Sequence, residues 1–239
     1  MIAHLPSLNC YPVSSFALPA AVLWDMDGTL IDTEPYWMEA EASLAHRFGI
    51  AWTDEDGLSL VGNPLDTSAR VLIDRGVRLE PGEIISTMIE QVSGKARAHM
   101  PWLADSRSLL DELIAAGVPC ALVTMSIGSL VDTFVEAAGD VFAAVVTGDQ
   151  VRHGKPDPEA YITAARRLGV DPGQCVAIED SPAGARSAHD SGAVTLAVRR
   201  HAPLPSLPGV SRLSSLEGIG LEGISLFFAG QVRDDFSAG

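Results

Sequence analysis

The stretch AAVLWDMDGTLIDTE, residues 20–34, decides which fold this chain adopts. Its first five residues are apolar and do not alternate with polar ones, which is typical of a parallel strand buried on both faces. Two carboxylates, Asp25 and Asp27, follow this run, and Pro35 then suits the first turn of a helix. The stretch therefore predicts a buried strand that ends in acidic residues and leads into a helix.

Four further short apolar runs share the character of the first: CALV (120–123), AAVV (143–146), CVAI (175–178) and AVTLAV (193–198). Helical patterns lie between them, over residues 106–116 and 158–168, and each stops at a glycine. Strands that alternate with helices in this way predict an α/β fold with a doubly wound, Rossmann-like parallel sheet.

The interval between Thr33 and Met100 breaks this alternation, because it contains helical patterns and no convincing buried strand. The patterns cover residues 34–48, 68–75 and 82–98. We therefore expect an all-helical cap domain inserted after the first strand. The predicted domains are an N-terminal leader (1–19), an α/β catalytic core (20–33 and 101–239) and the helical cap (34–100).

The charge balance excludes several classes of protein. The chain has 31 acidic and 16 basic residues, a net charge of −15, and yet 47% of its residues are hydrophobic. An acidic disordered chain would lack this apolar content. A protein this acidic is not attracted to nucleic acid or to anionic membranes, and no apolar run is long enough to span a bilayer.

The cysteines and the N-terminus bear on the compartment. Cys10, Cys120 and Cys175 are widely spaced and form no CxxC pair, so neither a disulfide framework nor a zinc site is indicated. Residues 1–19 contain three prolines and no basic region of the kind that begins a signal peptide. The predicted location is the cytoplasm.

Polar side chains follow the predicted strands at the edge where open α/β sheets bind ligands. The set comprises carboxylates, one hydroxyl and one ammonium group: Asp25, Asp27, Thr124, Lys155, Glu179 and Asp180. Carboxylates crowded at a water-poor strand end repel one another unless a cation lies between them. Mg²⁺ prefers oxygen ligands and binds readily beside phosphate, so a magnesium site for phosphoryl transfer is predicted.

Each of these residues also has a simpler interpretation. Asp25 and Asp27 would suit a turn, Lys155 a solvated surface and Glu179–Asp180 the start of a helix. A calcium loop would need glycine and glutamate at positions occupied here by Leu30 and Tyr36. The occurrence of the polar groups at the ends of successive predicted strands favours a joint functional site.

Four motifs in order make the sequence resemble the haloacid dehalogenase-like hydrolase superfamily: DMDGTLIDTE (25–34), VTMS (123–126), GKPDPEAY (154–161) and IEDSPAGA (178–185). The resemblance extends over about residues 20–200. It is greatest to the branch that contains beta-phosphoglucomutase and sugar-phosphate phosphatases, which carries a helical cap. It implies a phosphoric monoester hydrolase acting on a small phosphorylated metabolite.

The resemblance also implies catalytic roles. Asp25 is expected to be the nucleophile that forms an aspartyl phosphate, and Asp27 the acid and then the base. Thr124 and the backbone N–H of Met125 are expected to hold phosphoryl oxygens, and Lys155 to neutralise charge between nucleophile and phosphate.

The resemblance implies a metal site as well. Mg²⁺ is expected to bind Asp25, the backbone carbonyl of Asp27 and Asp180, with Glu179 as a further or water-mediated ligand. Gly28 is expected at the phosphate end of the site, where it permits the tight turn after Asp27.

The cap distinguishes the candidate reactions. The mutase pattern has a histidine and an arginine at positions that correspond here to Trp37 and the GNPL stretch (62–65). A phosphatase of sugar or polyol phosphates is therefore preferred. A sugar-phosphate mutase and a catalytically silent protein that binds a phosphorylated ligand are the alternatives, and a monomer is expected.

Overall fold

The structure is a computed structural model that describes residues 17–61 and 63–237. The greater part of the leader predicted over residues 1–19, together with Cys10, lies outside the described residues.

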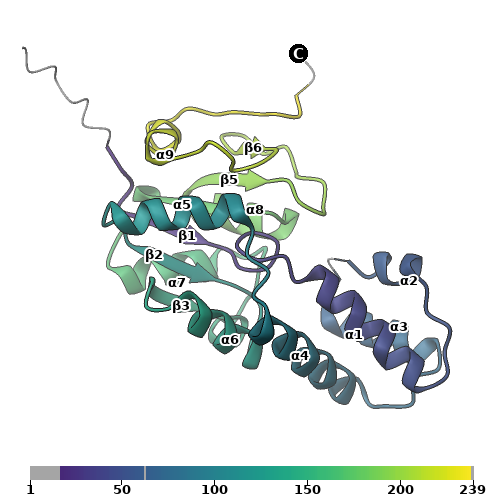
Figure 1. Ribbon diagram of the computed structural model, residues 1–239. Helices are drawn as coiled ribbons and strands as arrows, with labels where there is room; N and C mark the ends of the chain where they lie inside the picture. The colour runs from purple at the N-terminus through teal and green to yellow at the C-terminus, as the bar shows by residue number, and fades with distance from the viewer. Residues whose placement is uncertain (1–16, 62, 238–239) are drawn as a thin grey trace, which may run out of the picture.

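A six-stranded parallel sheet forms the centre of the molecule, in the order β3-β2-β1-β4-β5-β6 (Figure 1). The strands are β1 (Ala21–Trp24), β2 (Cys120–Val123), β3 (Phe142–Val146), β4 (Cys175–Glu179), β5 (Val194–Val198) and β6 (Ser211–Leu213). This order confirms the predicted doubly wound α/β fold. The sheet also contains β6, which the sequence does not predict because no apolar run covers it.

Alternate residues of the central strands enter separate cores. Val22 and Trp24 of β1 pack with α5 (Ala104–Ala115), α6 (Ser129–Ala138) and α9 (Leu221–Phe228). Ala21 and Leu23 of the same strand face the other side, against α7 (Glu159–Leu168) and α8 (Pro182–Asp190). Because both faces are covered by helices, β1 and β2 are wholly buried, which explains their continuous apolar sequence.

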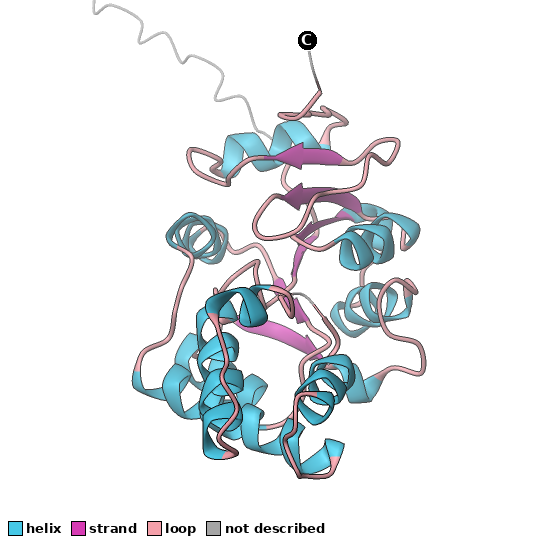
Figure 2. Ribbon diagram, turned by 90° about the vertical axis from the view of Figure 1, so that its right-hand side faces the viewer, coloured by secondary structure: helices cyan, strands magenta, loops and turns pink. Residues whose placement is uncertain are grey.

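The described residues between β1 and α5 form four helices: α1 (Glu34–Arg47), α2 (Asp54–Leu58), α3 (Leu65–Asp74) and α4 (Pro81–Ala98). Figures 1 and 2 show them as a group of helices beside the sheet, with no strand among the described residues of that interval. Helix α4 packs against α6 and so joins this group to the core. The limits predicted for the cap, 34 and 100, stay a prediction.

Two segments connect the helical group to the sheet, and they run side by side. Ile31 forms an antiparallel bridge with Trp102, and the backbone N–H of Asp32 donates to the carbonyl of Pro101 at 3.0 Å. The paired connectors place the start of α1 close to the end of β1, where the acidic residues lie.

Candidate active site

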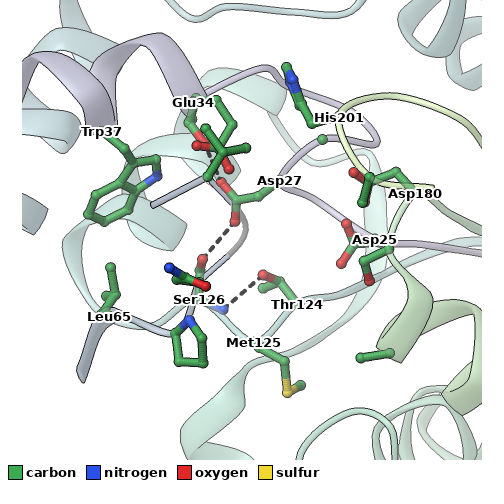
Figure 3. Close-up of a pocket in the computed structure, with 18 of the residues that line it drawn as sticks. Asp25, Asp27, Glu34, Trp37, Leu65, Thr124, Met125, Ser126, Asp180 and His201 are labelled. Carbon is green, nitrogen blue, oxygen red and sulfur yellow. Dashed lines mark hydrogen bonds between the residues drawn. The ribbon is translucent and has the colours of Figure 1, made fainter. Parts of the chain in front are cut away.

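The candidate site lies at the carboxyl ends of β1, β2 and β4. The chain runs outward from β1 to β3 on one side and from β4 to β6 on the other, so β1 lies at the point where the strand order reverses. Open parallel sheets bind ligands at this point because the loops after neighbouring strands diverge there. A cavity of about 970 Å³ opens there, between the strand ends and the helices α1–α4 (Figure 3).

Lys155 is at the centre of the buried charges. Its Nζ donates to Oδ1 of Asp25 at 2.6 Å, to Oε1 of Glu179 at 2.6 Å and to the carbonyl of Val123 at 2.9 Å. Burial opposes its charged form, but the carboxylates of Asp25 and Glu179 outweigh burial and raise its pKa. Lys155 is therefore a permanent cation beside Asp25.

Three carboxylates approach one another at this point. One oxygen from each of Asp25, Glu179 and Asp180 lies within 4.8 Å of the others, and all three residues are buried. Burial, and then the neighbouring Glu179, raise the pKa of Asp25 to about 7. Burial, and then Asp25, raise the pKa of Asp180 to about 9. A hard cation would relieve this crowding, so the donor set fits Mg²⁺.

Gly28 makes room for this cluster. It has a φ of +80°, and a Cβ atom there would lie 2.1 Å from Oδ2 of Asp180. A side chain at this position would therefore push the Asp180 carboxylate out of its place, which gives glycine a packing reason as well as a conformational one.

Glu179 lies behind the cavity rather than in its wall. Its Oε1 accepts from Lys155 and, at 3.0 Å, from the hydroxyl of Tyr161. Its Oε2 accepts from the backbone N–H groups of Asp180 and Ser181 and from the Ser181 hydroxyl. With five donors the carboxylate is well satisfied without a metal, and its contacts position Lys155 and the loop that carries Asp180.

Asp27 points towards α1 and the loop after β2, away from the cluster of three carboxylates (Figure 3). Its Oδ2 accepts from the Ser126 hydroxyl at 2.6 Å and its Oδ1 from the Thr33 hydroxyl at 2.8 Å. Burial raises the pKa of Asp27, while these two hydrogen bonds act in the opposite direction. A carboxyl group that is held in this way, and whose pKa is raised, is suited to exchange a proton with a bound substrate.

Thr124 and Met125 line the cavity at the end of β2. The hydroxyl of Thr124 accepts from the backbone N–H of Ser126 at 3.0 Å, so it shapes the turn that holds Ser126 under Asp27. The Met125 sulfur accepts from the backbone N–H of Lys155 at 3.4 Å and so links this loop to the loop after β3.

The structure thus brings most of the predicted residues together in one cavity wall: Asp25, Asp27, Gly28, Thr124, Met125, Lys155 and Asp180. Glu179 contacts this group from beneath, and the Asp27 carboxylate stands apart from the other three. The roles assigned to these residues stay predictions.

The sequence alone does not identify Thr33, Ser126 and Tyr161 as partners of the charged groups. Each lies within a quoted motif: Thr33 six residues after Asp27, Ser126 two after Thr124, and Tyr161 six after Lys155. The signal was therefore present, but a hydroxyl group in a loop identifies no partner until the loop is folded.

The helical side of the cavity carries a different chemistry. Figure 3 shows Glu34 and Trp37 of α1, with Leu65 of α3, on the side of Asp27 that faces away from Asp25. Leu58, Val61 and Ile89 extend this wall and make it largely apolar.

No helix in the described part of the chain is long and apolar enough to cross a membrane.

Comparisons with known proteins agree with this architecture. The family model described as haloacid dehalogenase-like hydrolase matches residues 22–198. Hexitol phosphatase A of Escherichia coli (strain K12) is 34% identical over 203 residues, which cover 82% of this chain and 91% of that protein. Fructose-1-phosphate phosphatase YqaB of the same organism is 29% identical over 75% of this chain and 96% of its own.

Solved structures have the same fold. CbbY from Rhodobacter sphaeroides, in complex with phosphate, aligns with a TM-score of 0.75 and 25% identity over 87% of this chain and 100% of its own. The match of the family model and the phosphatases among the relatives lead to one conclusion. This chain is a phosphoric monoester hydrolase that belongs to the haloacid dehalogenase-like hydrolase family.

Proposed function

We propose that this protein is a magnesium-dependent phosphatase that hydrolyses a small sugar or polyol phosphate through an aspartyl-phosphate intermediate. The observation that carries the proposal is the buried contact between Lys155 and Asp25, 2.6 Å long, beside the carboxylate of Asp180. This contact acts against the burial that raises the pKa of Asp25, and it places a cation where a phosphoryl group would meet it.

The first step transfers the phosphoryl group. A carboxylate oxygen of Asp25 attacks phosphorus, the bond to the leaving-group oxygen breaks, and Asp27 gives that oxygen a proton. Thr124 and the backbone N–H of Met125 hold the phosphoryl oxygens, and Lys155 offsets their negative charge.

The second step hydrolyses the intermediate. Asp27, now ionised, takes a proton from a water molecule, which attacks phosphorus and releases Asp25 and inorganic phosphate. The hydroxyls of Ser126 and Thr33 hold Asp27 through both steps, since a hydroxyl can donate to a carboxylate or accept from a carboxylic acid.

Mg²⁺ would be held by Asp25, Asp180 and the backbone carbonyl of Asp27, and bound there it supplies positive charge to the phosphoryl oxygens. Glu179 belongs to the same acidic group, and its five hydrogen bonds favour a supporting or water-mediated role.

The relatives support the substrate class. The names hexitol phosphatase A and fructose-1-phosphate phosphatase describe enzymes that act on phosphorylated polyols and sugars. Trp37 lines the cavity at the position where the mutase pattern has histidine, which favours hydrolysis over isomerisation.

The test is hydrolysis of p-nitrophenyl phosphate with and without Mg²⁺. We expect turnover that requires the metal and disappears in Asp25→Asn, while Asp111→Asn on the surface of α5 keeps it. A labelled substrate quenched with acid should leave phosphate on the wild-type protein and none on Asp25→Asn. Metal-independent turnover, or turnover by Asp25→Asn, would refute the proposal.

A further inference from the structure

The cavity has two chemically distinct ends. At the strand end, Lys155, Thr124 and Asp180 surround Asp25, as the site of a phosphoryl group requires. At the helical end the wall is formed by α1, by the segment before α3 and by α4. Asp27 lies between the two ends in Figure 3, so the leaving group of a bound phosphomonoester would occupy the helical end.

Cations are confined to the strand end. Among the described residues that line the cavity, Lys155 is the only lysine and no arginine is present. His201 also lines the cavity, and its Nε2 lies 3.1 Å from Oδ1 of Asp32, an acidic partner.

Three basic residues of the helical group make contacts outside the cavity. Arg75 forms an ion pair with Asp56 at 2.6 Å, and Arg97 donates to the hydroxyl of Thr133 at 3.1 Å. Lys95 pairs with Glu39. None of these cations lines the cavity, so none is placed to meet a second negative charge on the substrate.

The helical end instead presents negative and neutral polar groups beside an aromatic ring. Glu34 and Trp37 lie one helical turn apart on α1, and both side chains line the cavity. Asn63 and Asp66 line it from the segment that begins α3. Carboxylate and amide oxygens accept hydrogen bonds from hydroxyls, and an indole face packs against the C–H groups of a sugar chain.

We infer that the helical end is a specificity site for an uncharged polyhydroxylated leaving group, and that the carboxylates of Glu34 and Asp66 exclude substrates with a second phosphate or a carboxylate. This inference rests on the proposed phosphatase function and narrows its substrate class. A site that presents carboxylates to a negatively charged ligand disfavours that ligand by electrostatic repulsion, which selects against the wrong substrate.

The experiment compares substrates that differ only in this charge. Glucitol 6-phosphate has a hydroxymethyl group where 6-phosphogluconate has a carboxylate. Glycerol 3-phosphate and 3-phosphoglycerate differ in the same way and form a pair of shorter compounds. We expect kcat/KM to be higher for the uncharged member of at least one pair by about tenfold or more. In Glu34→Gln this ratio should fall by about threefold or more, because one repelling charge is removed.

Two measurements separate this effect from damage to the fold. Glu39→Gln removes the same charge from the same helix at a residue outside the cavity wall, and it should leave the ratio unchanged. The far-UV circular dichroism spectrum of Glu34→Gln should match that of wild type, and Glu39→Gln should keep its turnover of p-nitrophenyl phosphate within about twofold of wild type.

Three results would overturn the inference while leaving the phosphatase function intact: equal kcat/KM within both pairs, no hydrolysis of either pair, or an unchanged ratio in Glu34→Gln. In each case Mg²⁺-dependent turnover of p-nitrophenyl phosphate persists. Loss of that turnover as well would instead refute the proposed function and the inference with it.

Discussion

The ammonium nitrogen of Lys155 lies 2.6 Å from Oδ1 of Asp25, and only 5% and 10% of the two side chains are exposed. The contact joins the loop after β3 to the end of β1. Because the pair is buried, water cannot solvate one charge when its partner is removed. The loss of one partner therefore lowers the free energy of unfolding far more than the loss of a surface ion pair does.

Replacing Lys155 with methionine leaves the carboxylates of Asp25 and Glu179 buried together without their common cation. We expect kcat to fall by about 100-fold or more, and the free energy of unfolding to fall by about 3 kcal/mol. Urea unfolding and p-nitrophenyl phosphate turnover measure the two effects. The control is Lys95→Met, which changes the chain's other lysine at its contact with Glu39. Near wild-type turnover in Lys155→Met would show that the ion pair does not serve catalysis.

Ser126→Ala removes the shorter of the two hydroxyl contacts to Asp27. That hydrogen bond lowers the pKa of Asp27, so its loss should raise the pKa further. Since Asp27 must be protonated to act as the acid, the limb of the pH–rate profile on which activity falls with rising pH should move to higher pH. Ser129→Ala is the control, because its hydroxyl contacts Ser93 instead. An unchanged limb, or one moved to lower pH, would contradict this role of Ser126.

Gly28→Ala tests whether the Asp180 carboxylate needs the space that the missing side chain of Gly28 leaves. The new Cβ would lie 2.1 Å from Oδ2 of Asp180, so this carboxylate must move. Gly209→Ala has a similar backbone, with φ of +77°, and its Cβ would meet no atom within 4 Å. Both variants should lose about 1 kcal/mol of stability from the positive φ. Only Gly28→Ala should raise the Mg²⁺ concentration for half-maximal activity, by about tenfold or more, and equal requirements in the two variants would contradict a metal role for Asp180.

Glu41 gives the helical group a pH-dependent stability. It is 4% exposed on α1, and its Oε2 has no hydrogen-bond partner among the described residues. Burial, followed by the charge of Glu34, raises its pKa to about 8. Between pH 4.5 and about 8 the folded chain therefore keeps a proton that the unfolded chain releases, so stability falls as the pH rises through this range.

Glu41→Gln removes that titration. At pH 8.5 the variant should be more stable than wild type, by on the order of 3 kcal/mol at most, and the difference should shrink towards pH 5. Urea unfolding across this range, at saturating Mg²⁺, measures the change. A difference that is constant with pH would show that Glu41 does not titrate in the folded protein.

The regular elements of the sheet could be predicted because their signal is local. The run at 175–178 is apolar throughout since β4 is buried on both faces, and the pattern at 158–168 ends at Gly169, which adopts φ of 72° as the cap of α7. The strand β6 has only three residues, Ser211–Leu213, and its sequence carries no apolar run. It is a strand because it pairs with β5 on one side, and Arg212 forms a bridge with Asp234 as well.

The fold class, the family and the set of charged residues at the strand ends can all be predicted from the amino-acid sequence, because strand burial and motif spacing depend on neighbouring residues. The tertiary structure decided which partner each charge meets. Lys155 and Asp25 are 130 positions apart, as Ser126 and Asp27 are 99 apart, and Glu179 turned inward to five donors. The tertiary structure also placed Glu34, Trp37 and Asp66 on the largely apolar helical side of the cavity. These relations depend on how loops from separate strands converge, and no local pattern encodes that convergence.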